Sequence, residues 1–356
     1  MPVRALKYAA PLLLYVACFI SFQQHGIDVW LPMIYAWVWI PLLELWLKPD
    51  EKNLSEAEET LAKQNPWYDA MLYAIVPLQY LALYQFLGSM QEAGLSSIDR
   101  IGRICSMGLL CGTFGINVGH ELGHRIKPFE QWMAKALLGT SLYMHFFIEH
   151  NKGHHKNVAT PQDPSSARYN EPVYLFYFRT ILYSYRSAWH IANEECQKKK
   201  QSVFSLHNEM IQVHLLQALL VFLIGYVFGM SVLLYFLIAA AIGMLLLETV
   251  NYIEHYGLQR KPTASGYERT MPWHSWNSNH ILGRIMLFEL SRHSDHHYLA
   301  SRKYQVLRHH EAAPQLPTGY PGSMLLALLP PAWFYVMNRK IQQLEREHPA
   351  QRKSAP

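Results

Sequence analysis

Five long stretches of this sequence contain no Asp, Glu, Lys or Arg, and they constrain its fold more than any other feature. They are residues 8–27, 29–43, 70–90, 104–119 and 215–247. About 20 apolar residues span a bilayer core as a helix, so these runs predict transmembrane helices. The last run is long enough for two helices that meet at Gly229. We therefore predict an all-α membrane protein with six transmembrane helices, at about 5–25, 27–47, 67–90, 100–120, 211–229 and 231–250.

The charges and prolines between these runs predict the topology. Arg4 and Lys7, before the first run, indicate a cytoplasmic N-terminus. Residues 129–149 could almost span, but a span would hold His124 and His150 about 30 Å apart, so we predict a re-entrant or interfacial helix. A double proline interrupts the apolar patch 322–338, which predicts an interfacial segment. The charged tail from 340 predicts loose order, and the whole chain, 1–356, is predicted to form one domain with a His-rich cytoplasmic cap.

Histidine is the second constraint, because nine of the 19 histidines recur at spacings typical of metal ligands. His120 and His124 stand four residues apart at the end of a predicted helix, so one helical face presents both. Similar spacings recur twice further along the chain. The nine candidate ligands are His120, His124, His150, His154, His155, His255, His293, His296 and His297. Since all nine fall on one predicted side of the membrane, they predict a shared metal site.

The number of candidate ligands bears on the number of metal ions. A zinc site uses three or four protein ligands, so nine histidines predict two ions, one with four ligands and one with five. Imidazole suits iron and zinc alike, so the ligand type leaves the metal open. The four cysteines form no C-x-x-C pair, which excludes a rubredoxin or zinc ribbon within this chain.

Few carboxylates lie close enough to the histidine clusters to bridge two ions, and we favour over bridging the interpretation that polar residues in and near the clusters orient the ligands by accepting their second N–H. The carboxylates in this group are Glu121, Glu149, Asp163, Glu254 and Asp295. The neighbouring polar residues His274, Asn279 and His280 are candidates for the same supporting role.

Four segments of the chain resemble, in order, the signature regions of the bacterial integral-membrane alkane 1-monooxygenases. They read HELGHR (120–125), EHNKGHHKNVATPQDP (149–164), NYIEHYGL (251–258) and RHSDHH (292–297). PWHSWNSNH (272–280) and LPTGYPG (316–322) also look like segments of this family, and the resemblance covers nearly the whole chain. Looser forms of three motifs are shared with membrane fatty-acid desaturases and related hydroxylases. Two positions depart from the pattern, Ser291 in place of a Gln and Trp273 in place of a His, and neither is a candidate ligand.

The resemblance implies a membrane di-iron monooxygenase that hydroxylates the terminal carbon of medium- to long-chain n-alkanes. It implies two iron ions as cofactors, the nine histidines as their ligands, and a linear alkane entering from the lipid bilayer. It also implies a bacterial inner-membrane location with both termini and the active site facing the cytoplasm. Members often carry a bulky residue in the second helix that limits chain length. Counting back from Pro41 places Ala36 there, which predicts a deeper tunnel for longer chains.

The resemblance further implies a separate rubredoxin, with its reductase, as electron donor. A basic cytoplasmic face suits an acidic carrier, and Arg125, Lys127, Lys152 and Lys156 flank the candidate ligands. The net charge of +5 fits this bias, and no clustered basic motif points to a nucleic-acid partner.

Three other functions compete with this interpretation. HELGH matches the H-E-x-x-H motif of zinc proteases, with Glu121 as base, but an intramembrane protease leaves seven clustered histidines unexplained. A membrane fatty-acyl desaturase or hydroxylase uses the same di-iron chemistry, and NYIEHYG counts against it. A metal transporter requires polar residues in the middle of the membrane, and the predicted spans have almost none there.

Overall fold

Six helical stretches within the described residues, 2–347, are long and apolar enough to cross a membrane. In this computed structural model they are Arg4–Ser21, Gly26–Trp46, Pro66–Ser89, Ser97–Gly123, Glu209–Phe228 and Met230–His255. Together they overlap all five charge-free runs, and Gly229, with φ of 89°, divides the last run between two helices. The predicted all-α fold with six membrane helices is confirmed.

Three of these stretches are regular helices, namely α6 (Pro66–Ser89), α13 (Glu209–Phe228) and α14 (Met230–His255). The first stretch joins α1 (Pro2–Leu6) to α2 (Leu12–Ser21). The second and fourth contain π-helical turns, at Tyr35–Trp39 between α3 (Leu31–Ile34) and α4 (Ile40–Trp46), and at Cys111–Ile116 between α7 (Ser97–Leu110) and α8 (Asn117–Gly123). Such turns are rare and are frequent at functional sites.

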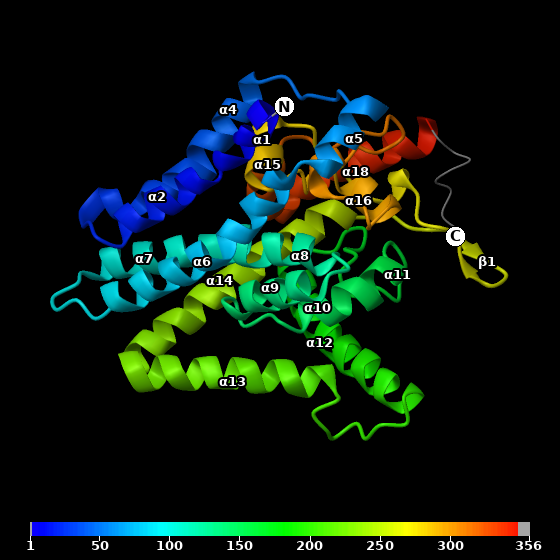
Figure 1. The fold of residues 1–356 in the computed structure, drawn as a ribbon. Coiled ribbons are helices and arrows are strands. Elements are labelled where there is room, and N and C mark those ends of the chain that lie inside the picture. Colours follow the sequence, from blue (N-terminus) through cyan, green and yellow to red (C-terminus); the bar gives the residue numbers. More distant parts are fainter. Residues whose placement is uncertain (1, 348–356) are drawn as a thin grey trace.

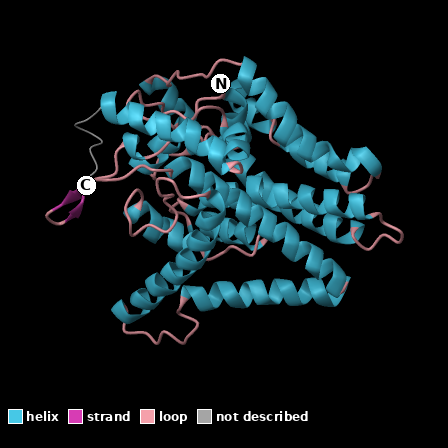
Figure 2. Cartoon of the chain, turned by 180° about the vertical axis from the view of Figure 1, so that it is seen from behind, coloured by secondary structure: helices cyan, strands magenta, loops and turns pink. Residues whose placement is uncertain are grey.

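The remaining α-helices and one small hairpin form a cap at one end of the membrane helices (Figures 1 and 2). The cap helices are α5 (Glu56–Gln64), α9 (Pro128–Gly139), α10 (Phe146–Glu149), α11 (His155–Asn157), α12 (Val173–Lys198), α15 (Ile281–Met286), α16 (His293–Tyr298), α17 (Tyr320–Ala327) and α18 (Pro330–Glu347). Strands β1 (Pro262–Thr263) and β2 (Gly266–Tyr267) pair antiparallel.

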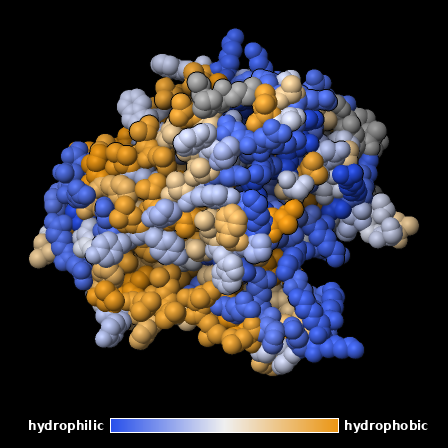
Figure 3. Space-filling model, in the orientation of Figure 1, coloured by the Kyte–Doolittle hydropathy of each residue, from blue (hydrophilic) through white to orange (hydrophobic). Residues whose placement is uncertain are grey.

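Apolar side chains cover the surface of the membrane helices. Figure 3 shows this apolar belt on the left and the mainly hydrophilic cap on the right. Phe222 and Tyr226 of α13 are 64% and 79% exposed, which is unfavourable in water and favourable in lipid. The surface therefore divides as expected for a helix bundle in a bilayer with a polar domain at one end.

The segment 129–149 does not form one continuous helix. Helix α9 ends at Gly139, Leu142 adopts a φ of 52°, and α10 begins at Phe146. This turn brings the His150 ring to 5.2 Å from that of His124, between centroids, where a straight span would hold them far apart. The depth of this segment in the bilayer stays a prediction.

The structure corrects the expectation for the C-terminal region. The patch 322–338 is broken into α17 and α18, and its place at the membrane interface stays a prediction. The loose order expected from residue 340 is wrong up to Glu347, where α18 ends. Trp333, Met337 and Ile341 recur every four residues and are buried, so one face of α18 packs on the core.

Candidate metal centre

The structure brings the nine clustered histidines together into two groups. Their ring nitrogens lie within 4.8 Å of one another in each group. The first group is His120, His124, His150, His155 and His296, and the second is His154, His255, His293 and His297. The groups adjoin, since the rings of His155 and His297 are 4.5 Å apart. A division into five and four matches the division expected from the sequence, and the ligand role of each residue stays a proposal.

Three kinds of local structure position these rings. His120 lies in α8, with His124 at its C-cap, so consecutive helical turns present both. His150 and His154 begin and end a third π-helical turn, and His155 follows directly. His255 is the last residue of α14, while α16 presents the remaining three. The long helices thus carry residues from distant parts of the chain to one end of the bundle.

The ring nitrogens converge in a way that fits metal ions. In the first group, the Nε2 atom of His120 lies 3.0 Å from that of His296 and 3.1 Å from that of His124. A neutral imidazole has one N–H. The converging Nε2 atoms therefore cannot all form hydrogen bonds with one another. A cation with metal–nitrogen bonds of about 2 Å would satisfy them together.

The electrostatics of the cap favour the neutral ligand form. Burial lowers the pKa of His124, His150, His155, His293, His296 and His297 well below the usual value. His154 is the exception. Burial lowers its pKa, but the neighbouring carboxylates, Asp163 foremost, together outweigh burial and raise it. Metal binding requires neutral imidazole, so most of these rings need lose no proton when a metal binds.

Asp163 contacts a clustered histidine in the manner predicted for an orienting carboxylate. Its Oδ2 atom lies 2.9 Å from His154 Nδ1 and also accepts from the hydroxyl of Ser166. This leaves His154 Nε2 directed at His297, 3.2 Å away. Asp163 therefore fixes the tautomer of His154 and aims its free nitrogen at the centre.

Glu254 takes a different position from the predicted one. Its Oε2 atom lies 3.1 Å from Nε2 of His293, the same nitrogen that faces His255 at 3.2 Å. Its other oxygen accepts from the Tyr320 hydroxyl at 2.7 Å. The carboxylate therefore lies on the metal side of the ring. Sequence reasoning missed Tyr320, although it lies in the quoted segment LPTGYPG.

Two further carboxylates that were predicted to orient ligands bind partners outside the two histidine groups. Glu121 accepts from Arg125 and from the backbone of Tyr304, and Asp295 accepts from Arg302 and His310. These two carboxylates brace the cap, which corrects the prediction for them.

Glu149 and two of the polar residues after α14, Asn279 and His280, also differ from the prediction, whereas the backbone of His274 hydrogen-bonds the candidate ligand His255. Among the described residues the Oε1 atom of Glu149 has no hydrogen-bond partner, and burial, aided by Asp163, raises the pKa of this carboxyl to about 8. His274 contacts Glu268, Asn279 contacts His309 and Gln315, and His280 contacts Ser278.

An apolar cavity of about 80 Å³ lies among the membrane helices, and Ala36 is in its wall. Both π-helical turns of the membrane helices contribute to it, through Ala36 and Trp37 and through Gly112 and Thr113. Asn117, which also lines it, precedes His120 by less than one helical turn. The cavity therefore approaches the histidine groups from within the apolar belt.

Comparison with known proteins places this arrangement in a family. The fatty acid desaturase family matches residues 102–324. Alkane 1-monooxygenase of Pseudomonas putida is 39% identical over 323 residues, which cover 90% of this chain and 80% of the relative. Alkane 1-monooxygenase 1 of Alcanivorax borkumensis is 39% identical over 88% of this chain and 78% of its own. The chain belongs to the alkane 1-monooxygenase family.

A more distant relative shows how wide this group is. The xylene/toluene monooxygenase hydroxylase component of Pseudomonas putida is 29% identical over 277 residues, covering 76% of this chain and 73% of the relative. All nine histidines lie inside the stretch matched by the desaturase family, whereas Ala36 lies before it. The alkane 1-monooxygenase chain thus shares its metal-site region with a broad family and places part of its cavity wall outside that region.

The basic residues considered for electron-carrier docking are not equivalent in this alkane 1-monooxygenase family member. Arg125 is buried and paired with Glu121 and Asp69, which corrects the prediction for it. Lys127 and Lys156 are exposed. Lys152 is exposed but pairs with Glu195 at 2.8 Å. Lys127 and Lys156 are therefore the best placed of the four to meet a partner.

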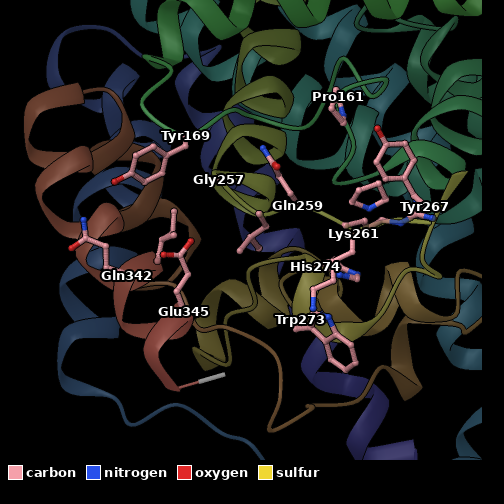
Figure 4. Close-up of a pocket in the computed structure, with 14 residues that line it drawn as sticks. Pro161, Tyr169, Gly257, Gln259, Lys261, Tyr267, Trp273, His274, Gln342 and Glu345 are labelled. Carbon is pink, nitrogen blue, oxygen red and sulfur yellow. The ribbon is translucent and has the colours of Figure 1, made fainter. Parts of the chain in front are cut away.

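A second hollow, of about 540 Å³, opens on the polar cap (Figure 4). Gly257, two residues after His255, lines it together with His274, Lys261 and Glu345. Its charged lining is unsuited to an alkane, so the apolar cavity is the candidate substrate site.

Proposed function

We propose that this protein hydroxylates the terminal carbon of medium- to long-chain n-alkanes with two iron ions, O₂ and electrons from reduced rubredoxin. One observation carries the proposal, namely that an apolar cavity reaches to within one helical turn of the histidine groups, since its lining includes Asn117, three residues before His120, and Tyr320, which donates to Glu254. The names of the relatives support the substrate class. Bound iron would supply the redox chemistry that lets one atom of O₂ enter a primary C–H bond while the other leaves as water.

The residues of the chain supply binding and orientation. An alkane has no polar group. Its binding free energy therefore comes from burying methylenes, which contributes about 0.8 kcal/mol for each one. Leu14, Ile40 and Leu247 are among the side chains that provide this burial. A narrow cavity presents the end of the chain to the histidine groups, which favours the terminal carbon by positioning.

A membrane fatty-acyl desaturase or hydroxylase is the alternative, supported by the family match over 102–324. An acyl substrate brings a polar head group that needs partners near the cavity. Asn117, the polar amide in the cavity lining, already donates to the backbone of Leu287 at 3.0 Å. The predominantly apolar lining therefore favours a hydrocarbon.

Metal analysis and product analysis on the same purified sample test the proposal. We expect two irons per chain, one for each histidine group, and 1-octanol from octane with O₂, NADH, rubredoxin and its reductase. A His255→Ala variant removes one member of the four-histidine group and should lose iron and product together, whereas His190→Ala, an exposed position on α12, should keep both. Oxidation of acyl chains alone would favour the alternative, and one zinc without iron would contradict the di-iron centre.

A further inference from the structure

A line of ring contacts leads from the first histidine group to α12 and α13. The ring of Phe146 stacks on that of His150, with centroids 4.6 Å apart. The ring of Tyr143 stacks on Phe146 at 6.0 Å. Tyr143 is 2% exposed and binds no histidine of either group. An oxidisable phenol thus lies one ring beyond the candidate metal ligands.

The line continues from Tyr143 to the surface of α12. His145 contacts Tyr143 at 4.5 Å between centroids and Tyr185 at 5.3 Å. His214 of α13 contacts both Tyr185, at 5.6 Å, and Trp189, at 5.5 Å. Tyr185 is 36% exposed, so the line ends at the protein surface. Its oxidisable members, Tyr143, Tyr185 and Trp189, are joined by rings that resist oxidation.

Each tyrosine hydroxyl in this line has its own proton acceptor. Tyr143 donates to Glu248 Oε1 at 2.8 Å. Tyr185 lies 3.0 Å from His214 Nε2, while His214 Nδ1 lies 2.7 Å from the Met210 carbonyl oxygen. Because a carbonyl only accepts, Nδ1 carries the proton and Nε2 is free to accept from Tyr185. A phenol loses an electron readily only when its proton can leave with it, and both tyrosines meet this condition.

We propose that Tyr143, Tyr185 and Trp189 form a relay that carries oxidising equivalents from the metal centre to the surface when O₂ is reduced without an alkane in the cavity. The inference rests on the redox-active centre proposed above. Tyr143 would give one electron toward the centre while its proton passes to Glu248. Tyr185 then reduces the Tyr143 radical and passes its own proton to His214, and Tyr143 recovers its proton from Glu248. A surface thiol supplies the final electron through Trp189. The thiol loses its proton to water and two of the resulting thiyl radicals join as a disulfide, while Tyr185 recovers its proton from His214, so the buried histidines are spared from oxidation.

The ring that lies between the two tyrosines is compatible with electron transfer. Burial lowers the pKa of His145 to about 4, so this ring is neutral and adds no positive charge between the two tyrosines. A positive charge there would oppose the passage of an electron vacancy. None of the rings in the line is part of the cavity lining, so the relay does not pass through the substrate cavity.

Rapid-freeze EPR tests the relay independently of product formation. Reduced, iron-loaded protein is mixed with O₂ in the absence of alkane and frozen at short times. We expect an organic-radical signal that narrows when the protein contains ring-deuterated tyrosine. The signal should be lost in Tyr143→Phe and should persist at Tyr143, without reaching the surface, in Tyr185→Phe. Both variants and Trp189→Phe should inactivate severalfold faster per O₂ consumed, with oxidised His150 detected by mass spectrometry.

Tyr183→Phe is the matched control, because Tyr183 lies on the same helix and is 51% exposed. It should keep the wild-type signal and lifetime. Iron content and O₂ consumption are measured on every sample. Wild-type protein that consumes O₂ without a tyrosyl signal, or Tyr185→Phe with the wild-type signal and lifetime, would overturn the relay alone. Wild-type protein that holds no iron or consumes no O₂ would overturn the proposed function, and the relay with it.

Discussion

At the scale of single residues, the carboxylates near the histidines separate by what they touch. Asp163 binds His154 Nδ1, whereas Asp295 binds Arg302 and His310. Both are buried acids within predicted metal motifs, and only the contacts tell them apart. A carboxylate that fixes a ligand's tautomer contributes to metal affinity, while one that braces the cap contributes to folding.

This difference predicts opposite outcomes for two matched substitutions. Asp163→Asn should lower metal affinity by about 10- to 100-fold, because His154 loses the partner that fixes its ring. Asp295→Asn should melt at a lower temperature and keep metal affinity near the wild-type value, because it weakens the ion pair with Arg302. Competition with a chelator and thermal denaturation in detergent measure the two quantities. Equal loss of affinity in both variants would show that Asp295 also supports the centre.

The sequence was sufficient to predict the clustered histidines but not the residues that contact and orient them. Spacings of three and four residues place side chains on one helical face, so His120, His124 and the α16 cluster were recognisable. The partner of Asp295, His310, is 15 residues away and lies in an irregular segment with no periodicity. Tyr143 was missed for a similar reason, since only folding brings it to Glu248.

At the scale of elements, the metal-bearing helices depend on a close approach between α7 and α14. A Cβ atom at Gly243 of α14 would lie 2.5 Å from the Cβ atom of Cys111 and 3.1 Å from the backbone nitrogen of Gly112. A Cβ atom at Gly108 of α7 would lie 2.6 Å from Cγ2 of Ile242. Small residues at such contacts let membrane helices approach closely. Sequence alone located both helices but gave no sign of this contact, because glycines also occur on lipid-facing surfaces.

Gly243→Ala should therefore destabilise the protein by about 1–3 kcal/mol, the usual cost of overpacking a tight core. Because α14 ends at His255, we also expect weaker metal retention in this variant. Gly225→Ala in α13 is the control, since its nearest neighbours are the tips of the flexible Leu233 and Met230 side chains. Denaturation in detergent compares the two variants. A Gly243→Ala protein as stable as Gly225→Ala would show that the helices separate at little cost.

At the scale of the whole molecule, two hollows of different character lie in different parts of the protein. The apolar cavity lies between the membrane helices and the helices α15 and α17 of the cap, and the polar hollow beside His274 opens on the cap (Figure 4). We propose that a hydrocarbon enters from lipid and that a soluble electron donor binds from water. The charge-free runs predicted the belt and the histidines predicted the cap. The cavity between them was reached only through the family resemblance at Ala36.

We propose that this cavity sets the range of chain lengths that the protein accepts. Replacing Ala36 with Trp should fill the wall and shift the product profile toward shorter alkanols. Each methylene that no longer fits loses about 0.8 kcal/mol, which is roughly a fourfold fall in kcat/KM. Val38→Trp is the matched control, because Val38 lies in the same π-helical turn and is 46% exposed, outside the cavity lining. Gas chromatography of products from a mixture of n-alkanes compares the variants. If Ala36→Trp and the wild type gave the same profile, chain length would be set elsewhere, and the alkane would reach the centre by a route that does not pass Ala36.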